Sequence, residues 1–300
     1  MGKRCLVWCL WTAAGLSLVL ESGCGRLGEG RRIVAFETAG AEIKLLGFPI
    51  HNSSEDGEPA WTYRHNAALD LLADHGADVI GLQGADPVQV QDLQRGLAVY
   101  EAVGTGSADW DPTWPICPVL YRKDRFRAAQ TGSFWFSNTP WAAGSVHWGQ
   151  GSPRVCIWVR LTERLTGRTF IVYNMQMDRR SAWSREKSAE LLLRQIARGK
   201  RDEPVVVFGD FVDSADSRLI RILQGAEQTA GAEGTGLVDT WLPSALEGVV
   251  DGLSSRETDG AEVILVSPQV EILWAEVDRR MFEGRRPSGC FPAAALIRLP

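Results

Sequence analysis

The chain has 300 residues, of which 45% are hydrophobic, and a formal net charge of −5 at pH 7. This length and apolar content allow one large domain or two ordinary ones with a sizeable core, and they exclude a low-complexity or repeat protein. A chain with a net negative charge does not attract polyphosphates, so we expect no general binding to nucleic-acid backbones. Local basic pairs such as Arg179-Arg180 are expected to be solvated surface.

The first 24 residues have the pattern of an export signal. A basic start precedes an apolar run over residues 5–20. A membrane-spanning helix needs about 20 apolar residues, so this run is short for one. Ser22-Gly23-Cys24 resembles the end of a bacterial lipobox, although Glu21 stands where an aliphatic residue is usual. Three outcomes stay open: lipidation at Cys24, cleavage of a plain signal, and an uncleaved anchor. We expect an exported protein of the cell envelope, periplasm or exterior, with membrane contact only through this segment.

Eight short stretches beyond the signal have the β-branched and aromatic composition of strands. They lie at 32–37, 77–83, 117–122, 154–161, 169–177, 204–210, 261–267 and 293–299. Two stretches, 61–76 and 184–199, repeat apolar residues at helical spacing and end in glycine. Because strands dominate and the helices do not alternate strictly with them, the pattern favours packed sheets flanked by helices. No linker divides residues 31–300, which we expect to form a single domain.

Two cysteines, Cys117 and Cys156, lie in strand-like runs. An oxidising compartment would permit a disulfide between them, but the sequence alone does not determine the pairing. A Cys117–Cys156 bridge and two buried thiols are therefore both open.

The stretch EPVVVFGDFVDSADS, residues 203–217, begins as a buried strand and reaches a carboxylate at Asp210. A carboxylate at the end of a buried strand costs free energy unless it is paired or coordinates a metal. Asp210 is therefore a candidate catalytic or metal-binding residue.

Seven motifs, in order along the chain, resemble those of the endonuclease/exonuclease/phosphatase superfamily. They are Trp61 with Arg64, DVIGLQG (78–84), FWFSNTP (134–140), NMQMD (174–178), GDFV (209–212), AEVI (261–264) and SGCFPA (288–293). The resemblance covers about residues 31–300 and implies a DNase I-like fold of α+β class, a four-layer α/β/β/α sandwich. In this family, metal and phosphate chemistry takes place where strand ends of both sheets converge. The resemblance places Asp210 at the catalytic aspartate, which positions or deprotonates the attacking water.

Most of the catalytic positions that the resemblance assigns carry other residues in this chain. The substituted positions are Glu37, Gly84, Gln176, Val212, Glu262, Gly289 and Cys290. Gly84 stands for the glutamate that binds the divalent metal, Gln176 for a histidine and Val212 for an asparagine. The positions that keep the family residue are Asn174 and Asp210.

These substitutions remove the groups on which phosphoester hydrolysis depends. The reaction needs a Mg²⁺-type ion with oxygen ligands, an acid–base group, and donors for the developing charge. Gly84 has no side chain to coordinate an ion, Gln176 cannot transfer a proton near neutral pH, and the Cys290 thiol is a weak donor. We therefore predict a non-catalytic relative with a binding or envelope-associated role, without a cofactor and with an unidentified partner. Asp210 and Asn174 are then remnants.

A rebuilt metal site is the alternative hypothesis. If the first strand lies beside the DVIGLQG strand, Glu37 could supply the carboxylate that Gly84 lacks. Asp210 and Glu262 would complete a set of three acids, and Mg²⁺ or Mn²⁺ needs only one or two carboxylates plus waters. The protein would then be a divalent-metal-dependent phosphoesterase or phosphodiesterase.

The histidines and several tryptophans have no assigned catalytic role. None of His51, His65, His75 and His147 falls at a catalytic position of the family. For Trp110, Trp114, Trp141 and Trp148, packing in the core or loops and stacking on a sugar or base are both open, while Trp135 is expected to be structural. Arg154, at the start of its strand, either faces the phosphate site or is a surface arginine.

Overall fold

A computed structural model describes residues 9–11, 17–19, 41–51, 60–104, 116–199, 202–211, 217–241, 262–282, 284 and 286–300. The chain divides into two compact units, Met1–Ala41 and Glu42–Pro300. In the first unit, the short strands β1 (Cys9–Trp11) and β2 (Ser17–Val19) pair antiparallel. None of the described helices combines the length and the apolar character that crossing a lipid bilayer requires. The export signal at residues 1–24 stays a prediction.

Two six-stranded sheets form the centre of the second unit. The first sheet has the strand order β11-β12-β10-β9-β8-β7, and the second has the order β13-β14-β3-β4-β6-β5. The strands of the first sheet are β7 (Phe126–Trp135), β8 (Val155–Glu163), β9 (Thr169–Gln176), β10 (Val205–Asp210), β11 (Val238–Asp239) and β12 (Val263–Val266). Those of the second are β3 (Glu42–Pro49), β4 (Val79–Gln83), β5 (Tyr100–Val103), β6 (Val119–Arg122), β13 (Glu271–Val277) and β14 (Ala293–Arg298).

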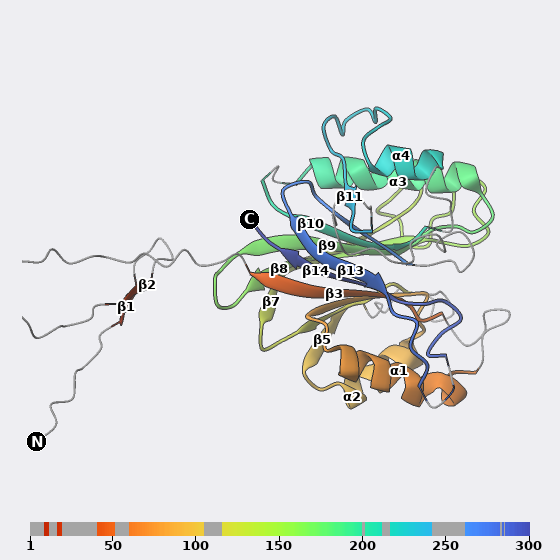
Figure 1. Ribbon diagram of the computed structural model, residues 1–300. Coiled ribbons are helices and arrows are strands. Elements are labelled where there is room, and N and C mark those ends of the chain that lie inside the picture. The colour runs from red at the N-terminus through yellow and green to blue at the C-terminus, as the bar shows by residue number, and fades with distance from the viewer. Residues whose placement is uncertain are drawn as a thin grey trace, which may run out of the picture. The chain divides into compact units, whose positions relative to one another are not determined.

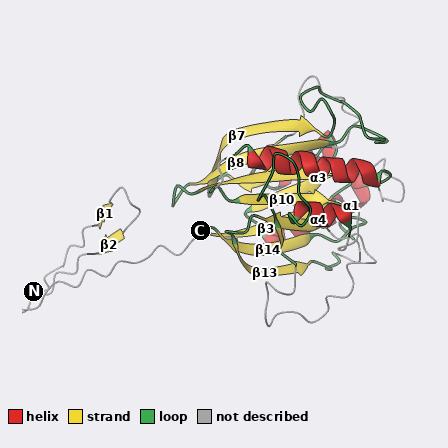
Figure 2. Ribbon diagram, turned by 90° about the horizontal axis from the view of Figure 1, so that it is seen from above, coloured by secondary structure: helices red, strands yellow, loops and turns green. Residues whose placement is uncertain are grey.

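Helices cover the outer face of each sheet, so the unit has four layers (Figure 1). The helices are α1 (Trp61–His75), α2 (Pro87–Gly96), α3 (Ala182–Ala197) and α4 (Arg218–Leu223). The first pair packs on the second sheet, and the other pair packs on the first sheet. Seen from above, α3 and α4 lie over the first sheet, with β7 at its edge (Figure 2). The predicted four-layer α/β/β/α sandwich is therefore confirmed.

Apolar strands hold the two sheets together. Between the sheets, β10 contributes Val206 and Phe208, and β3 contributes Ile43 and Leu45. A Cβ atom at Gly81 of β4 would lie 2.5 Å from the Phe208 ring, so the glycine lets the sheets approach at this point. Burial of this kind is the main favourable term in folding and explains the continuous apolar run of β10.

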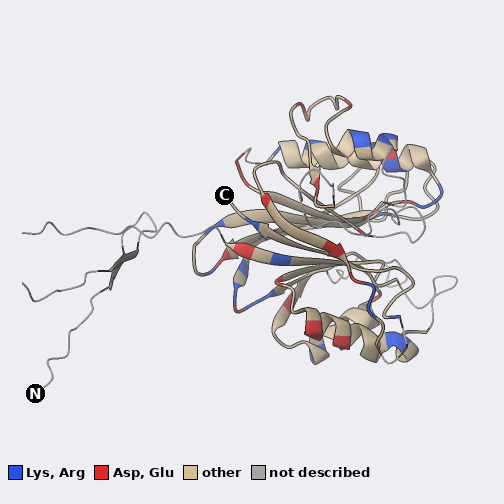
Figure 3. Cartoon of the chain, viewed as in Figure 1, with Lys and Arg blue, Asp and Glu red and all other residues tan. Residues whose placement is uncertain are grey.

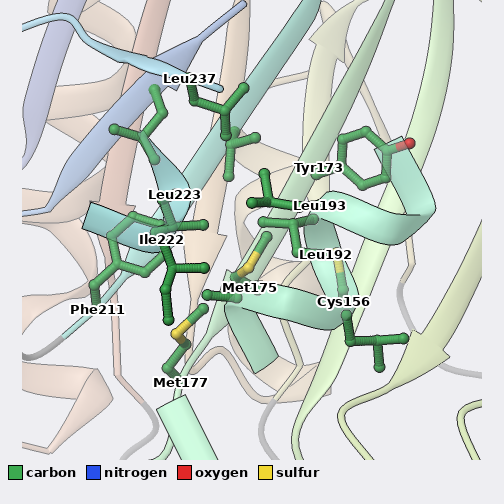
Figure 4. Close-up of a cluster of buried hydrophobic side chains, with 14 of the residues drawn as sticks. Cys156, Tyr173, Met175, Met177, Leu192, Leu193, Phe211, Ile222, Leu223 and Leu237 are labelled. Atoms are coloured by element: carbon green, nitrogen blue, oxygen red, sulfur yellow. The ribbon is translucent and has the colours of Figure 1, made fainter. Parts of the chain in front are cut away.

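A second apolar layer joins the first sheet to its helices. Met175 and Met177 pack with Leu192 and Leu193 of α3 and with Ile222 of α4 (Figure 4). Leu192 and Leu193 come from the apolar face that the spacing of residues 184–199 predicts. The helix itself begins earlier than expected, because Ser181 is its N-cap and accepts a hydrogen bond from the Ser184 N–H at 3.1 Å.

The first strand of the sandwich is not the one that the sequence predicts. The strand that pairs in parallel with β4 is β3, Glu42–Pro49, whereas residues 32–37 lie outside the described residues. The strand that lies in this place ends at Pro49, and Glu37, assigned to the end of the first strand, lies outside the described residues. The prediction of 32–37 rests on its own apolar and aromatic composition, whereas Lys44 and Gly47 interrupt the apolar pattern of β3. In the fold, the Lys44 ammonium donates to the His75 carbonyl at 2.6 Å, and Gly47 lies under the Glu262 side chain.

Arg64 of α1 anchors the loop that follows β3. Its side chain is fully buried, and its guanidinium donates to the carbonyls of Ile50, His51 and Pro287. A buried guanidinium requires such acceptors, because an unpaired buried charge is very costly. The tryptophan–arginine motif of this helix thus holds two loops at one end of the second sheet.

Candidate functional site

The candidate site lies where strands of both sheets end. β9 and β10 run parallel with Gln176 opposite Asp210, and β3 and β4 run parallel with Pro49 opposite Gln83. Asn174 connects these two pairs. Its side-chain oxygen accepts from Gln83 Nε2 at 2.7 Å, and its Nδ2 donates to the carbonyls of Leu82 and Pro118, both at 2.8 Å. Asn174 is completely buried, so its amide joins the sheets beneath the site.

Asp210 is the buried carboxylate at the centre of the site. Its Oδ2 accepts hydrogen bonds from Gln176 Nε2 and from an Arg179 N–H, both at 3.2 Å, and lies 3.6 Å from His51 Nε2. Burial opposes ionisation, but the neighbouring His51 ring and the charge of Arg179 outweigh it and lower the pKa of Asp210. The carboxylate is therefore ionised at neutral pH, with a guanidinium as its counter-charge.

His51 is a residue of this site that the sequence did not identify. It is buried, and its backbone has a φ of 48°, a left-handed conformation that is uncommon outside glycine. Its N–H donates to the Gln83 carbonyl at 3.1 Å, and its carbonyl accepts from Arg64 and from Gln89 Nε2 at 2.8 Å. His51 lies two residues after the end of β3, and no spacing of residues in the sequence singles it out.

Arg179 links His51 to Asp210. One terminal nitrogen of its guanidinium lies 3.0 Å from His51 Nε2 and 3.2 Å from Asp210 Oδ2. A guanidinium only donates, so His51 Nε2 is the acceptor, and the ring proton belongs on Nδ1. The Arg179 side chain is 42% exposed. Arg179 is exposed, as expected, but the loop after β9 also directs its side chain to the buried carboxylate.

Arg154 and Gln176 extend the network on the other side of Asp210. Arg154 donates to Gln176 Oε1 at 3.1 Å, and Gln176 Nε2 donates to Asp210, so the glutamine amide is held between a cation and an anion. The Arg154 Nε is buried without a hydrogen-bond partner among the described residues and lies 3.9 Å from Asp178. Arg154 was open to two roles, facing the phosphate site or lying on the surface. Its position in this network favours the role at the site.

Asp178 fixes the loop that carries Arg179. Its carboxylate accepts backbone N–H groups of Gly151, Arg180 and Ser181 at 2.8–3.0 Å. Burial would raise the pKa of Asp178, but these three backbone hydrogen bonds outweigh it and lower that pKa. Asp178 is therefore an ionised structural residue.

The site fits a divalent metal poorly. Gly84 has a φ of 69°, and a Cβ atom there would lie 3.3 Å from the Gln176 amide and 3.4 Å from His51 Cα. A glutamate at this position would be strained in its backbone and crowded by its neighbours. Within the described part of the chain, no three His, Cys, Asp or Glu side chains gather as a group that could hold a metal ion. We therefore derive no step through a metal.

Glu262 is the acidic residue that the fold does bring to Asp210. It precedes β12, whose Val263 pairs with Gly209, so the two carboxylates lie at the same end of neighbouring strands. Glu262 is buried, and its Cγ would be 2.4 Å from a Cβ at Gly47 of β3. Its side chain thus fills the space that glycine leaves in the second sheet.

The other predicted positions are only partly brought together. The loop with Gly289 and Cys290 approaches β3, because Ser288 Oγ donates to the Pro49 carbonyl. Gly289 is exposed and Cys290 is half-buried. Three of the assigned positions lie outside the described residues: Cys24, Glu37 and Val212.

The structure gives Cys117 and Cys156 as buried free thiols rather than a disulfide. Burial raises the pKa of the Cys117 thiol to about 12, so it stays protonated at neutral pH. A protonated thiol is a poor nucleophile, which argues against thiol chemistry beside the site.

Comparison with known proteins identifies relatives of the fold. Residues 47–278 match the family model described as the Endonuclease/Exonuclease/phosphatase family. No curated protein sequence matches the chain. An endonuclease/exonuclease/phosphatase structure from Bacteroides vulgatus is 22% identical with a TM-score of 0.72, covering 87% of this chain and 100% of that chain.

Two further solved structures are similar over comparable lengths. A mannosyl-6-phosphatase from Bacteroides thetaiotaomicron is 22% identical, with a TM-score of 0.67, over 85% of this chain and 99% of that one. The catalytic domain of human Nocturnin, solved with a bound sulfate anion, is 16% identical, with a TM-score of 0.66, over 86% and 95%. At these identities, the likeness concerns the fold alone.

Proposed function

The chain belongs to the endonuclease/exonuclease/phosphatase family, and we propose that its domain binds a phosphate-type anion. We further propose that it does not hydrolyse phosphoesters by the family's metal-dependent reaction. Both parts rest on the family membership and on the pairing of Asp210 with Arg179. The pairing is the observation that carries the proposal. A cation that the chain itself supplies lies against the buried carboxylate, at 3.2 Å. A divalent ion at this oxygen would have to displace Arg179 and Gln176.

Two arginines support the anionic nature of the ligand. Arg179 is 42% exposed and Arg154 is 15% exposed, so solvent reaches both side chains. Guanidinium groups present several N–H donors in a fork that matches phosphate oxygens. Each arginine already offsets an aspartate, so affinity would come from these directed donors rather than from a large net positive charge. Nocturnin, which shares the fold, binds a sulfate anion in its solved structure.

The arrangement of the polar groups argues against efficient hydrolysis. Gln176 stands at the histidine position and cannot transfer a proton, and its amide is held by Arg154 and Asp210. His51 Nε2 accepts from Arg179, so its basic lone pair is engaged. The loss of one acid–base group typically costs about 10²–10⁴-fold in rate. Lys and Arg are interspersed with Asp and Glu along the described chain (Figure 3), which suits a small anionic ligand better than a long polyanion.

Titration with inorganic phosphate in the presence of EDTA tests the proposal. We expect saturable calorimetric binding that Arg179→Gln weakens by about 10–100-fold, since a hydrogen bond to a charged group contributes about 1.5–3 kcal/mol. Arg221→Gln removes an equal charge from α4 and should leave binding unchanged. Phosphate binding that requires a divalent metal, or that survives Arg179→Gln, would overturn the proposal.

Residues 1–24 support the further proposal that the domain acts outside the cytoplasm. Fractionation of cells that express the full chain, compared with Cys24→Ala, tests export and lipidation together. Recovery of the unmodified chain in the cytoplasm alone would contradict export.

A further inference from the structure

A second hollow lies on the outer face of the first sheet, bordered by β7, β8, β9 and the end of α3, with a volume of about 480 Å³. It is separate from the site of Asp210. Side chains alternate along a strand, so Val205 and Val207 of β10 face α3, whereas Phe208 and Asp210 face the other sheet. Tyr173, opposite Val207, lines the hollow, which we call the outer groove.

Trp158 forms the floor of the outer groove. It pairs across the strands with Gly132 of β7, where a Cβ atom would lie 2.7 Å from the indole atoms Cε2 and Cζ2. One side of the indole therefore covers the glycine backbone. The residue is only half-buried and lines the groove, so part of its ring is open to a ligand.

Trp141 forms a second aromatic wall. Its side chain is 67% exposed, and its ring meets the edge of Phe134 at a centroid distance of 6.5 Å. A large aromatic side chain in water leaves favourable burial unused, and at a concave site such residues mark ligand binding. Of the two roles open for this tryptophan, its exposure favours stacking over packing.

Polar groups of both kinds line the same groove. Arg160 Nε donates to Glu203 Oε1 at 2.5 Å, and this ion pair is mostly buried. The Gln195 side-chain oxygen accepts from Arg198 at 3.4 Å, while its Nε2 is buried with no hydrogen-bond partner among the described residues. A buried donor without an acceptor costs free energy, and a ligand oxygen in the groove that accepted this hydrogen bond would remove that cost.

We propose that the outer groove binds a neutral saccharide. A pyranose ring has an apolar C–H face, which stacks on an indole, and hydroxyl groups, which both donate and accept. Such hydroxyls can accept from Gln195 and donate to Glu203 at once. Arg160 balances the charge of Glu203, so the groove does not require a charged ligand. A volume of about 480 Å³ lies in the range of small-molecule sites.

Calorimetric titration with cellotetraose, maltotetraose, mannotetraose and chitotetraose tests this binding. We expect saturable binding of at least one of them, weakened about fivefold or more by Trp141→Ala, since an aromatic contact contributes about 1 kcal/mol or more. Gln195→Leu should also weaken it. Trp141 is exposed, so its replacement should not impair folding.

Trp183→Ala is the matched control, because this tryptophan is 54% exposed at the start of α3 and does not line the groove. The Trp183→Ala variant should bind the saccharide with the affinity of the wild type. The proposal fails if none of the four saccharides binds, if Trp141→Ala and Gln195→Leu both keep wild-type affinity, or if adenosine binds in their place. Because phosphate binding through Arg179 is measured separately, this proposal and the proposed function can fail independently.

Discussion

Replacing Arg64 with alanine is expected to lower the free energy of unfolding by about 3–5 kcal/mol. The substitution removes a fully buried side chain and leaves the carbonyls of Ile50, His51 and Pro287 without their donor. It also releases the backbone that holds His51 in its left-handed conformation. Urea unfolding followed by circular dichroism measures the loss.

Arg95→Ala is the control for Arg64→Ala. The Arg95 side chain is 65% exposed and pairs with Asp92 within the same helix, so its loss should cost less than about 1 kcal/mol. If the two variants unfold at the same urea concentration, the anchoring role of Arg64 is wrong. Phosphate binding should also fall in Arg64→Ala, even under conditions in which the variant is fully folded.

Restoring the family's glutamate at position 84 is expected to destabilise the protein rather than to create a metal site. A left-handed residue with a side chain costs about 1–3 kcal/mol, and crowding in a packed interior adds about 1–3 kcal/mol. Gly84 meets both conditions, because its φ is 69° and a Cβ atom added there would lie 3.3 Å from the Gln176 amide. Thermal unfolding measures the loss, and calorimetry with Mn²⁺ shows whether an ion binds.

Gly167→Glu is the control that separates the backbone strain of Gly84→Glu from the crowding of its side chain. Gly167 has a similar φ of 73°, but a Cβ atom there would meet nothing within 4 Å. It should therefore show only the backbone cost. A Gly84→Glu variant that is no less stable than Gly167→Glu would contradict the crowding by Gln176 and His51.

The order of the motifs was sufficient to predict the fold, but not the strand that begins it. The strand composition of β4, β9 and β10 is clear because these strands are buried on both faces. β3 was missed because Lys44, Gly47 and Pro49 make it a poor strand by composition. Those residues are explained only by tertiary neighbours, such as the Glu262 side chain above Gly47.

The site was predicted only in part, because some of its residues also depend on tertiary neighbours. Asp210 and Asn174 follow from the motifs, and Glu262 does reach the site. His51 depends on a backbone conformation that Arg64 and Gln89 impose from other elements, and Arg179 depends on the direction of a loop. Neither leaves a signal in the spacing of residues, so the arginine that pairs with Asp210 became visible only in the structure.

A titration of the wild-type protein with Mn²⁺ tests most directly whether an arginine has replaced the metal at Asp210. We expect no saturable binding near neutral pH in the wild type, in Glu262→Gln or in Asp210→Asn, and no turnover of phosphomonoesters or phosphodiesters with Mn²⁺ present. Saturable binding in the wild type that Asp210→Asn and Glu262→Gln both abolish, accompanied by hydrolysis, would contradict the account and establish the metal-dependent phosphoesterase.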